Sequence, residues 1–358
     1  MLRACRILLG IVTVLIPAAN AQENWPPVPP NSHELVAGPA QILTSPEERA
    51  TALNLVDRAR QNYNFYVEHG PAWSLRVSFN ATGKSDHEGQ GTYEDTWLDV
   101  RHFRWSGEMG GSTFGRTVYR GQMWWINGPA PVPLRLQMAR VAILWPGISV
   151  LPRTGLRMQN VNFEGSAVTC VLASPNSANP SAGRSWTESE SCVDGKTGLL
   201  RVWSAAPGIY VVYDYTKTIS FHGHTIASSV TYYEDEAPVL QIHVESITDP
   251  AGVSLEDFRP TPEIIAQGRA PVLGGPARIA VPAGAADAPG ATVIQPVIVH
   301  GIVMPGGTLS DAEVITHVEP ALAEQAIALA KEKCRCGNFP TQQVEILITV
   351  RMHVPRTQ

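Results

Sequence analysis

Few residues of this chain are spaced for chemistry. GxSxG, Walker, GxGxxG and HExxH patterns are all absent, and these are the patterns that place a nucleophile, a phosphate-binding backbone or zinc ligands. The one tight histidine pair is His222 and His224. On a strand the two rings would share a face and could bind a metal. A zinc site normally takes at least three protein ligands, so we interpret the pair as an exposed strand start after a turn. We expect no metal and no cofactor.

Acidic residues offer the next candidates. Residues 234–236 read Glu-Asp-Glu between two strand-like runs, but a calcium loop needs a fuller ligand set at fixed spacing. We therefore predict a solvated hairpin tip. Glu94, Asp95 and Asp99 could supply a carboxylate pair for acid–base catalysis. Strand alternation sends neighbours to opposite faces, so we interpret all three as surface charges. No catalytic residue is assigned, and the chain is not expected to be an enzyme.

The cysteines indicate an oxidising compartment. Cys5 lies in the N-terminal segment, and four more follow. An even number in an exported chain predicts disulfides. The simplest pairing joins Cys170 to Cys192, across a loop whose closure is worth ~3 kcal/mol. Cys334 and Cys336 could form a tight disulfide, remain a free pair or ligate a metal. A metal is disfavoured because no other cysteine or nearby histidine completes a zinc set.

Aromatic side chains are the last chemical candidates. Several fall on strand-like runs of the first part of the chain. They could line a cavity for an apolar ligand, or they could form an ordinary sheet core, where aromatics are expected. The sequence leaves both readings open. The candidate lining residues are Trp97, Phe103, Trp105, Trp124 and Tyr213.

The first residues predict export. Arg3 and Arg6 precede an apolar run over residues 7–16, and Ala19-Asn20-Ala21 has the small-x-small form of a cleavage site. This order is that of a secretory signal peptide over residues 1–21. We therefore expect a soluble periplasmic protein. The formal net charge is −5 without any basic block, which argues against nucleic acid as a partner.

The elements that must position these residues change in period along the chain. After a flexible lead-in over 22–44, Ser45, Pro46 and Glu48 predict a capped helix. From Trp73 onward residues alternate apolar and polar, as in half-buried antiparallel strands. Further strand-like runs cover 92–98, 102–105, 117–119, 123–126, 199–203, 209–215, 225–233 and 239–247. One helix followed by many short strands predicts an α+β fold in which a large antiparallel sheet curls around a helix.

This part of the chain, residues 45–262, resembles the LolA/LppX-like lipoprotein-sorting family. The segments that carry the resemblance cover 91–107, 119–128, 192–203 and 244–260. They give a strand ending in His-Phe-Arg-Trp, a Trp-bearing strand after a turn glycine, an Asp-Gly-Lys-Thr-Gly hairpin and a closing Phe-x-Pro. The resemblance implies a half-barrel of antiparallel strands over helices and an apolar cargo, a lipid or a lipoprotein.

Residues 263–292 are rich in Ala, Pro and Gly and predict a semi-flexible linker. The last part, 293–357, has the order strand, strand, helix, strand. It resembles a TonB C-terminal domain at Gly306-Gly307, Pro320-Ala321-Leu322, 326–331, Phe339-Pro340 and 344–354. A tryptophan at the helix end and a membrane anchor, both usual in that family, are missing. The resemblance implies a small ββαβ domain whose last strand pairs with a partner peptide.

The leading hypothesis is therefore a periplasmic, non-enzymatic protein of the cell envelope. Its terminal domain would add a short extended peptide of an outer-membrane or envelope protein to its edge strand, through main-chain hydrogen bonds. An exposed edge also makes a strand-swapped homodimer conceivable. The alternatives are a lipid or lipoprotein carrier with a cavity in the first domain, and an enzyme of unknown type. The expected edge-strand residues are Gln343, Val344, Glu345, Ile346, Leu347, Ile348, Thr349, Val350 and Arg351.

Overall fold

The computed structural model describes residues 40–67, 69–82, 88–128, 132–144, 155–174, 188–206, 209–234, 237–270, 277–281, 292–304, 306–314, 318–333 and 344–355. The predicted signal peptide, nearly all of the lead-in, Gln343 and the Cys334–Cys336 pair lie outside these residues. Among the described residues, no helix combines the length and the hydropathy needed to cross a membrane.

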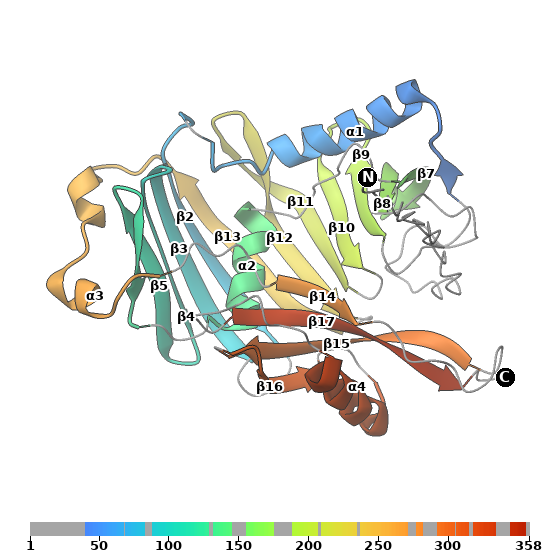
Figure 1. The fold of residues 1–358 in the computed structure, drawn as a ribbon. Helices are drawn as coiled ribbons and strands as arrows, with labels where there is room; N and C mark the ends of the chain where they lie inside the picture. The colour runs from blue at the N-terminus through green and yellow to red at the C-terminus, as the bar shows by residue number, and fades with distance from the viewer. Residues whose placement is uncertain are drawn as a thin grey trace, which may run out of the picture.

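One large sheet dominates the molecule (Figure 1). Its thirteen strands follow the order β1-β7-β8-β9-β10-β11-β12-β13-β2-β3-β4-β5-β6, and every neighbouring pair is antiparallel. The predicted curved antiparallel sheet is confirmed. The strands are β1 (Gln41–Ile42), β2 (Trp73–Ala81), β3 (Gly89–Asp99), β4 (His102–Met109), β5 (Ser112–Tyr119), β6 (Gln122–Ile126), β7 (Gly155–Phe163), β8 (Ser166–Ser174), β9 (Ser189–Asp194), β10 (Leu200–Ala206), β11 (Ile209–Phe221), β12 (His224–Glu234) and β13 (Ala237–Thr248).

Helix α1 (Pro46–Gln61) begins at the predicted capping box. The Ser45 hydroxyl accepts a hydrogen bond from the Glu48 amide at 3.1 Å, and the Glu48 carboxylate accepts one from the Ser45 amide. These two bonds satisfy two amides that a helix start leaves without partners. The stripe that contains Ala52, Val56 and Ala59 is buried. It packs the helix along one rim of the curved sheet, on β7 and β9.

A second helix, α2 (Leu134–Leu144), stands inside the curve and was not predicted. It packs on β3, β4 and β13. Its close approach depends on Gly107 of β4, because a Cβ atom at that position would lie 2.6 Å from Cδ1 of Leu136. Leu134, Leu136 and Ile143 are among the most buried side chains of the structure. The helix therefore belongs to the core of the first domain.

The chain then passes through a short 3-10 helix, η1 (Leu255–Phe258), and α3 (Pro262–Ala266), which lie at the β5–β6 end of the sheet. The structure differs here from the predicted linker over 263–292. Part of α3 falls inside that range, the Ala270 amide donates to the Met123 carbonyl at 2.9 Å, and residues 277–281 form a strand. Ala/Pro/Gly-rich composition thus does not prevent pairing where a neighbouring strand offers partners.

The terminal part forms a second sheet of four strands in the order β14-β17-β15-β16. The predicted order of strand, strand, helix, strand is present in β15 (Thr292–Val303), β16 (Leu309–Val314), α4 (Pro320–Lys333) and β17 (Val344–Pro355). The additional strand β14 (Ala277–Val281) pairs parallel to β17, and β15 pairs antiparallel to it. The expectation that the last strand is an edge is therefore wrong in the described structure, where β14 and β16 are the edges.

The terminal sheet is buried on two sides. Val297 and Val299 of β15 belong to a cluster with Ala326 and Ala330 of α4. Ile298, between them, is 3% exposed and belongs instead to the core of the large sheet. Alternate residues of one strand thus serve two clusters. The second sheet consequently lies against the first domain, close to α2 (Figure 1).

Candidate functional site

The inner face of the large sheet is built from side chains in register across neighbouring strands. One row joins Leu75, Asp95, Trp105, Arg116 and Trp125 on β2 to β6. The next row joins Trp73, Trp97, Phe103 and Val118. Period-two alternation sends these residues to one face of the sheet, and all except Phe103 and Trp125 are buried. The inner face is thus a wall of aromatic side chains with two charged groups set into it.

Asp95 is the centre of a buried polar cluster, not a surface charge as the sequence suggested. Its side chain is fully buried, and its Oδ2 accepts hydrogen bonds from Tyr66 at 2.7 Å, Tyr93 at 2.9 Å and Arg140 of α2 at 3.1 Å. Burial raises the pKa of Asp95, while the Arg140 charge and the tyrosine hydroxyls oppose the rise. The Oδ1 atom is buried and has no hydrogen-bond partner among the residues that the structure describes.

Two guanidinium groups lie over the Trp105 ring. That of Arg140 is 5.0 Å from the ring centroid and that of Arg116 is 5.9 Å from it. Arg116 also lies over Trp125 at 4.7 Å. Burial and then the nearby Arg140 charge lower the pKa of Arg116 to about 10. Burial also disfavours the charged form of Arg140, but Tyr66, Tyr93 and Asp95 outweigh it and raise its pKa overall.

Two further ion pairs are buried. Arg135 of α2 donates two hydrogen bonds to Glu234 at the end of β12, at 2.5 and 3.1 Å. Arg157 of β7 donates hydrogen bonds from Nε and Nη2 to the two carboxylate oxygens of Glu188. The prediction of a solvated tip is therefore wrong for Glu234, which is 4% exposed. Residues 235 and 236 lie outside the described part of the chain.

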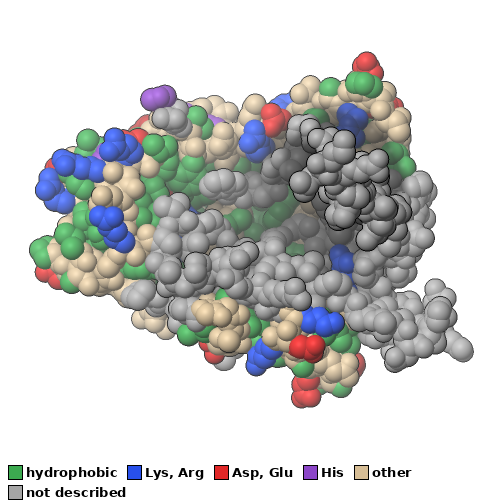
Figure 2. Space-filling view, in the orientation of Figure 1, with side chains coloured by type: hydrophobic (Ala, Val, Ile, Leu, Met, Phe, Trp, Pro, Cys, Tyr) green, Lys and Arg blue, Asp and Glu red, His purple; other side chains and the backbone are tan. Residues whose placement is uncertain are grey.

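The inner face is hollowed. Figure 2 shows a depression at the centre of this face whose floor is coloured by hydrophobic side chains, over the strands between α1 and β14. Those strands, β10 to β12, contribute buried apolar residues to the main core. These buried residues include Trp203, Val211, Tyr213, Ile226, Val230 and Tyr232. The geometry suits a ligand with a long apolar part.

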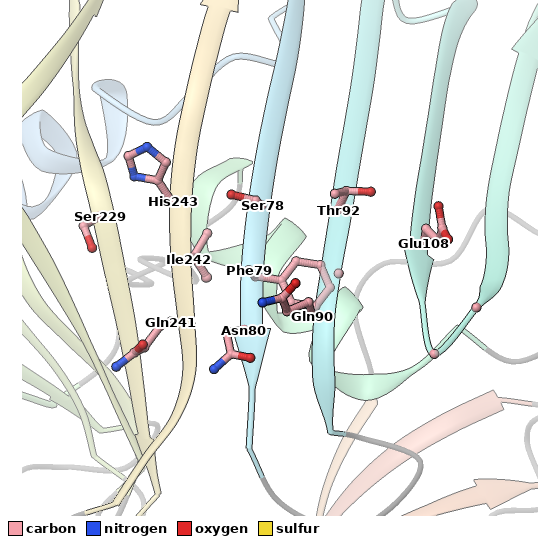
Figure 3. A pocket seen from close by; sticks show the side chains of 13 residues that line it. Ser78, Phe79, Asn80, Gln90, Thr92, Glu108, Ser229, Gln241, Ile242 and His243 are labelled. Carbon is pink, nitrogen blue, oxygen red and sulfur yellow. The ribbon is translucent and has the colours of Figure 1, made fainter.

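A second depression lies on the opposite, outer face (Figure 3). It has a volume of about 620 Å³ over β12, β13, β2, β3 and β4. Its side chains also stand in register, in one row of Ser229, His243, Ser78, Thr92 and Glu108, and a second row of Gln241, Asn80 and Gln90. The two rows are polar, and Phe79 and Ile242 also line the depression, so its lining is mixed.

The predicted lining residues divide between the two faces. Trp97, Phe103, Trp105 and Tyr213 lie on the inner face and pack in or against the main core. Trp124 belongs instead to a small cluster with Tyr119 and Phe258. The Tyr213 hydroxyl donates to the Ala142 carbonyl of α2 at 3.0 Å. Which of these side chains meets a ligand stays a prediction.

The predicted peptide-binding residues Val344 to Arg351 all lie on β17, between β14 and β15. A partner peptide would have to displace β14 to pair with this strand from that side. Peptide binding by these residues and a strand-swapped homodimer remain predictions.

Cys170 and Cys192 are joined, as predicted, by a disulfide between directly opposed residues of β8 and β9. Glu190 lies beside them, and the three side chains would have the spacing of a metal-binding group. Because the two sulfurs bond to each other, they present no thiolates to a metal.

The histidine pair does not form a common site. His222 Nε2 lies 2.7 Å from the Asp249 carboxylate, whereas His224 Nδ1 lies 3.1 Å from the Asn62 carbonyl. The two rings therefore face different partners, His222 the residue after β13 and His224 the C-terminal end of α1.

The sequence missed Arg140, Arg116, Tyr66 and Tyr93 as members of a polar site. The signal that could have found it is the alternation Tyr93-x-Asp95-x-Trp97. Residues two apart on a strand share a face, so Asp95 had to lie between two large aromatics.

No family model and no curated protein match this chain. Among solved structures, a LolA superfamily protein, NE2245 from Nitrosomonas europaea, is 10% identical with a TM-score of 0.38 over 58% of this chain and 97% of its own. A domain named for outer membrane lipoprotein sorting, from Vibrio parahaemolyticus, is 8% identical with a TM-score of 0.36 over 62% and 100%. A DUF1329 family protein from Desulfovibrio piger is 13% identical with a TM-score of 0.35 over 60% and 98%. None of the three is described as a TonB domain. Likeness this low says nothing about ligand or activity.

Proposed function

We propose that this protein is an exported, non-enzymatic carrier that holds an apolar chain, of a lipid or a lipoprotein, on the inner face of its large sheet. The observation that carries the proposal is the hollow with a hydrophobic floor (Figure 2). The predicted signal peptide supports a periplasmic location for the carrier.

The dimensions of the elements support the proposal. Thirteen strands about 4.8 Å apart span about 58 Å of sheet, whereas α1 with 16 residues and α2 with 11 are about 24 and 16 Å long. Helix α1 packs on β7 and β9, and α2 packs on β3, β4 and β13. Neither helix makes its main contacts with β10 to β12, whose inner-face side chains are apolar, and the hollow over these strands suits a ligand with an apolar part.

The polar groups of the inner face fit the same reading. Asp95 and Glu234 are each paired with an arginine of α2. Paired charges lower the cost of burial in an apolar environment. The described inner face thus combines a continuous apolar floor with a few fixed polar points, which is the usual composition of a lipid site.

The proposal is tested by native mass spectrometry of the protein purified from an envelope extract, before and after organic extraction. We expect an added lipid mass that extraction removes. The variant Ser228→Trp places a large side chain on the inner face of β12, in phase with Ile226 and Val230, and should abolish the added mass. The control Thr231→Trp, on the other face of the same strand, should retain it.

A wild-type protein without bound lipid would contradict the proposal, as would a folded Ser228→Trp protein with its lipid intact. Overpacking could unfold this variant. Displacement of an environment-sensitive apolar dye from the wild-type protein by added fatty acid therefore provides a second measurement. Failure of fatty acid to displace the dye would count against a carrier.

A further inference from the structure

Arg140 uses only part of its hydrogen-bond donors within the described structure. An arginine side chain carries five N–H donors in a planar fork. Within the described residues, only Nη2 of Arg140 is engaged, by Tyr66 at 2.7 Å and Asp95 at 3.1 Å. Its Nε is buried without a hydrogen-bond partner. The side chain as a whole is 27% exposed, so part of it remains accessible.

Arg140 lies on the partly exposed side of α2. Most of α2 is buried, and the residues that are only half-buried in its second half are Gln137, Arg140 and Val141. They recur at i, i+3 and i+4 and form one stripe of the helix. A ligand lying along α2 would therefore meet Arg140.

The same place holds a second cation. Arg116 and Arg140 both lie within 6 Å of the Trp105 ring, at 5.9 and 5.0 Å, and Asp95 is the acid next to Trp105 in the same row. Burial and then repulsion by Arg140 lower the pKa of Arg116, and an anion bound beside the two guanidinium groups would reduce that repulsion.

We propose that Arg140, with Arg116 beside it at the Trp105 ring, binds the anionic headgroup of the carried lipid, a carboxylate or a phosphate. This inference rests on the proposed function and specifies its ligand class. Arginine suits both anions because its fork donates two parallel hydrogen bonds. The surrounding tryptophans limit access of water, which strengthens each charge-assisted bond.

The test compares two ligands that differ in the headgroup alone. Palmitate and hexadecanol have chains of equal length, and at about pH 8 the acid is ionised. Dissociation constants are measured on delipidated protein by dye displacement. We expect palmitate to bind at least about tenfold more tightly than hexadecanol, the ratio expected for one charge-assisted hydrogen bond.

A double variant isolates the site. Arg140→Gln alone would strand the buried Asp95 carboxylate, so Asp95→Asn is combined with it to remove that charge. We expect the ratio to fall toward one, mainly through weaker palmitate binding. The control Arg76→Gln removes an exposed arginine of the outer face that pairs with Glu94 and should leave the ratio unchanged.

Each of the following results would contradict a stated part of the proposal. Equal affinities for both ligands in the wild-type protein would overturn the headgroup site and leave the carrier function standing. A ratio that the double variant preserves would also overturn it. Absence of binding by both ligands would remove the proposed function itself. Inorganic phosphate that binds as tightly as palmitate would identify a site for the free anion in place of a lipid headgroup.

Discussion

Arg135 of α2 and Glu234 of β12 form a doubly hydrogen-bonded ion pair in which each side chain is 4% exposed. The pair ties the interior helix to the far end of a strand 99 residues later in the chain. Glu234→Ala should lower the free energy of unfolding by about 3–5 kcal/mol, because the Arg135 charge would remain buried without its partner. Urea denaturation measures this loss.

A double-mutant cycle checks the cause. The Arg135→Met, Glu234→Leu protein should be more stable than the Glu234→Ala protein, because neither charge is then buried alone. If the losses of unfolding free energy in the single variants Arg135→Met and Glu234→Leu sum to the loss in the double variant, the two side chains do not act as a pair.

Gly107 and Leu136 set how closely α2 approaches the sheet. Gly107→Ala should lower the free energy of unfolding by about 1–3 kcal/mol, because its Cβ would overlap the Leu136 side chain. Combining it with Leu136→Ala should cost less than the sum of the single changes, since the new methyl group enters the space that leucine leaves. Thermal denaturation of the four proteins measures the coupling.

Gly195→Ala is the matched control, because a Cβ at this position would meet no atom within 4 Å. A Gly107→Ala protein as stable as this control would contradict the close helix–sheet contact.

The disulfide between Cys170 and Cys192 closes a loop with a sequence separation of 22. Replacing both residues with alanine should cost ~3 kcal/mol, mainly through greater freedom of the unfolded chain. The change is measured as the shift of the urea midpoint, with and without reductant. Reductant should shift the wild-type protein toward the variant and leave the variant itself unmoved, and a wild-type midpoint indifferent to reductant would argue against the bond.

Alkaline pH should destabilise the fold. Burial raises the pKa of Tyr63, Tyr66, Tyr93, Tyr213 and Tyr215 above the ordinary tyrosine value. Above about pH 10 the unfolded chain releases these protons while the folded chain keeps them. The unfolded state then binds fewer protons, so the free energy of unfolding falls as pH rises.

The measurement is phenolate absorbance followed together with circular dichroism during an alkaline titration. Most of the phenolate signal from buried tyrosines should appear with the loss of structure. Tyr213→Phe should remove one tyrosine from the late signal. Complete phenolate absorbance in a protein with intact dichroism would contradict the raised pKa values.

Much of the fold could be predicted because local patterns decide it. The capping box of α1 and the alternation from Trp73 onward can each be recognised within a few residues. The structure contains both the helix and the strand that they predict. Helix α2 could not be found in this way. Eight of its 11 residues are buried. Buried residues therefore occur on most sides of the helix, and its sequence lacks the amphipathic pattern that marks a surface helix.

The misjudged acids have a related cause. Asp95 and Glu234 are ionic residues in strands, and a charge in an alternating run normally marks the solvent side. Here each meets an arginine of α2, and the partner is distant in sequence. The edge position of β17 failed for the same reason, because β14 comes from a segment whose composition gives no strand signal.

The alternation of β15 has a consequence for the order of folding. Ile298 completes the core of the large sheet, while Val297 and Val299 complete the terminal one. A shift of one residue would exchange these side chains and leave both cores wrong. The register of β15 is therefore fixed by two cores, that of the large sheet and that of the terminal sheet. The core of the large sheet therefore includes a side chain from a strand that is synthesised later, and the two halves share one structural element.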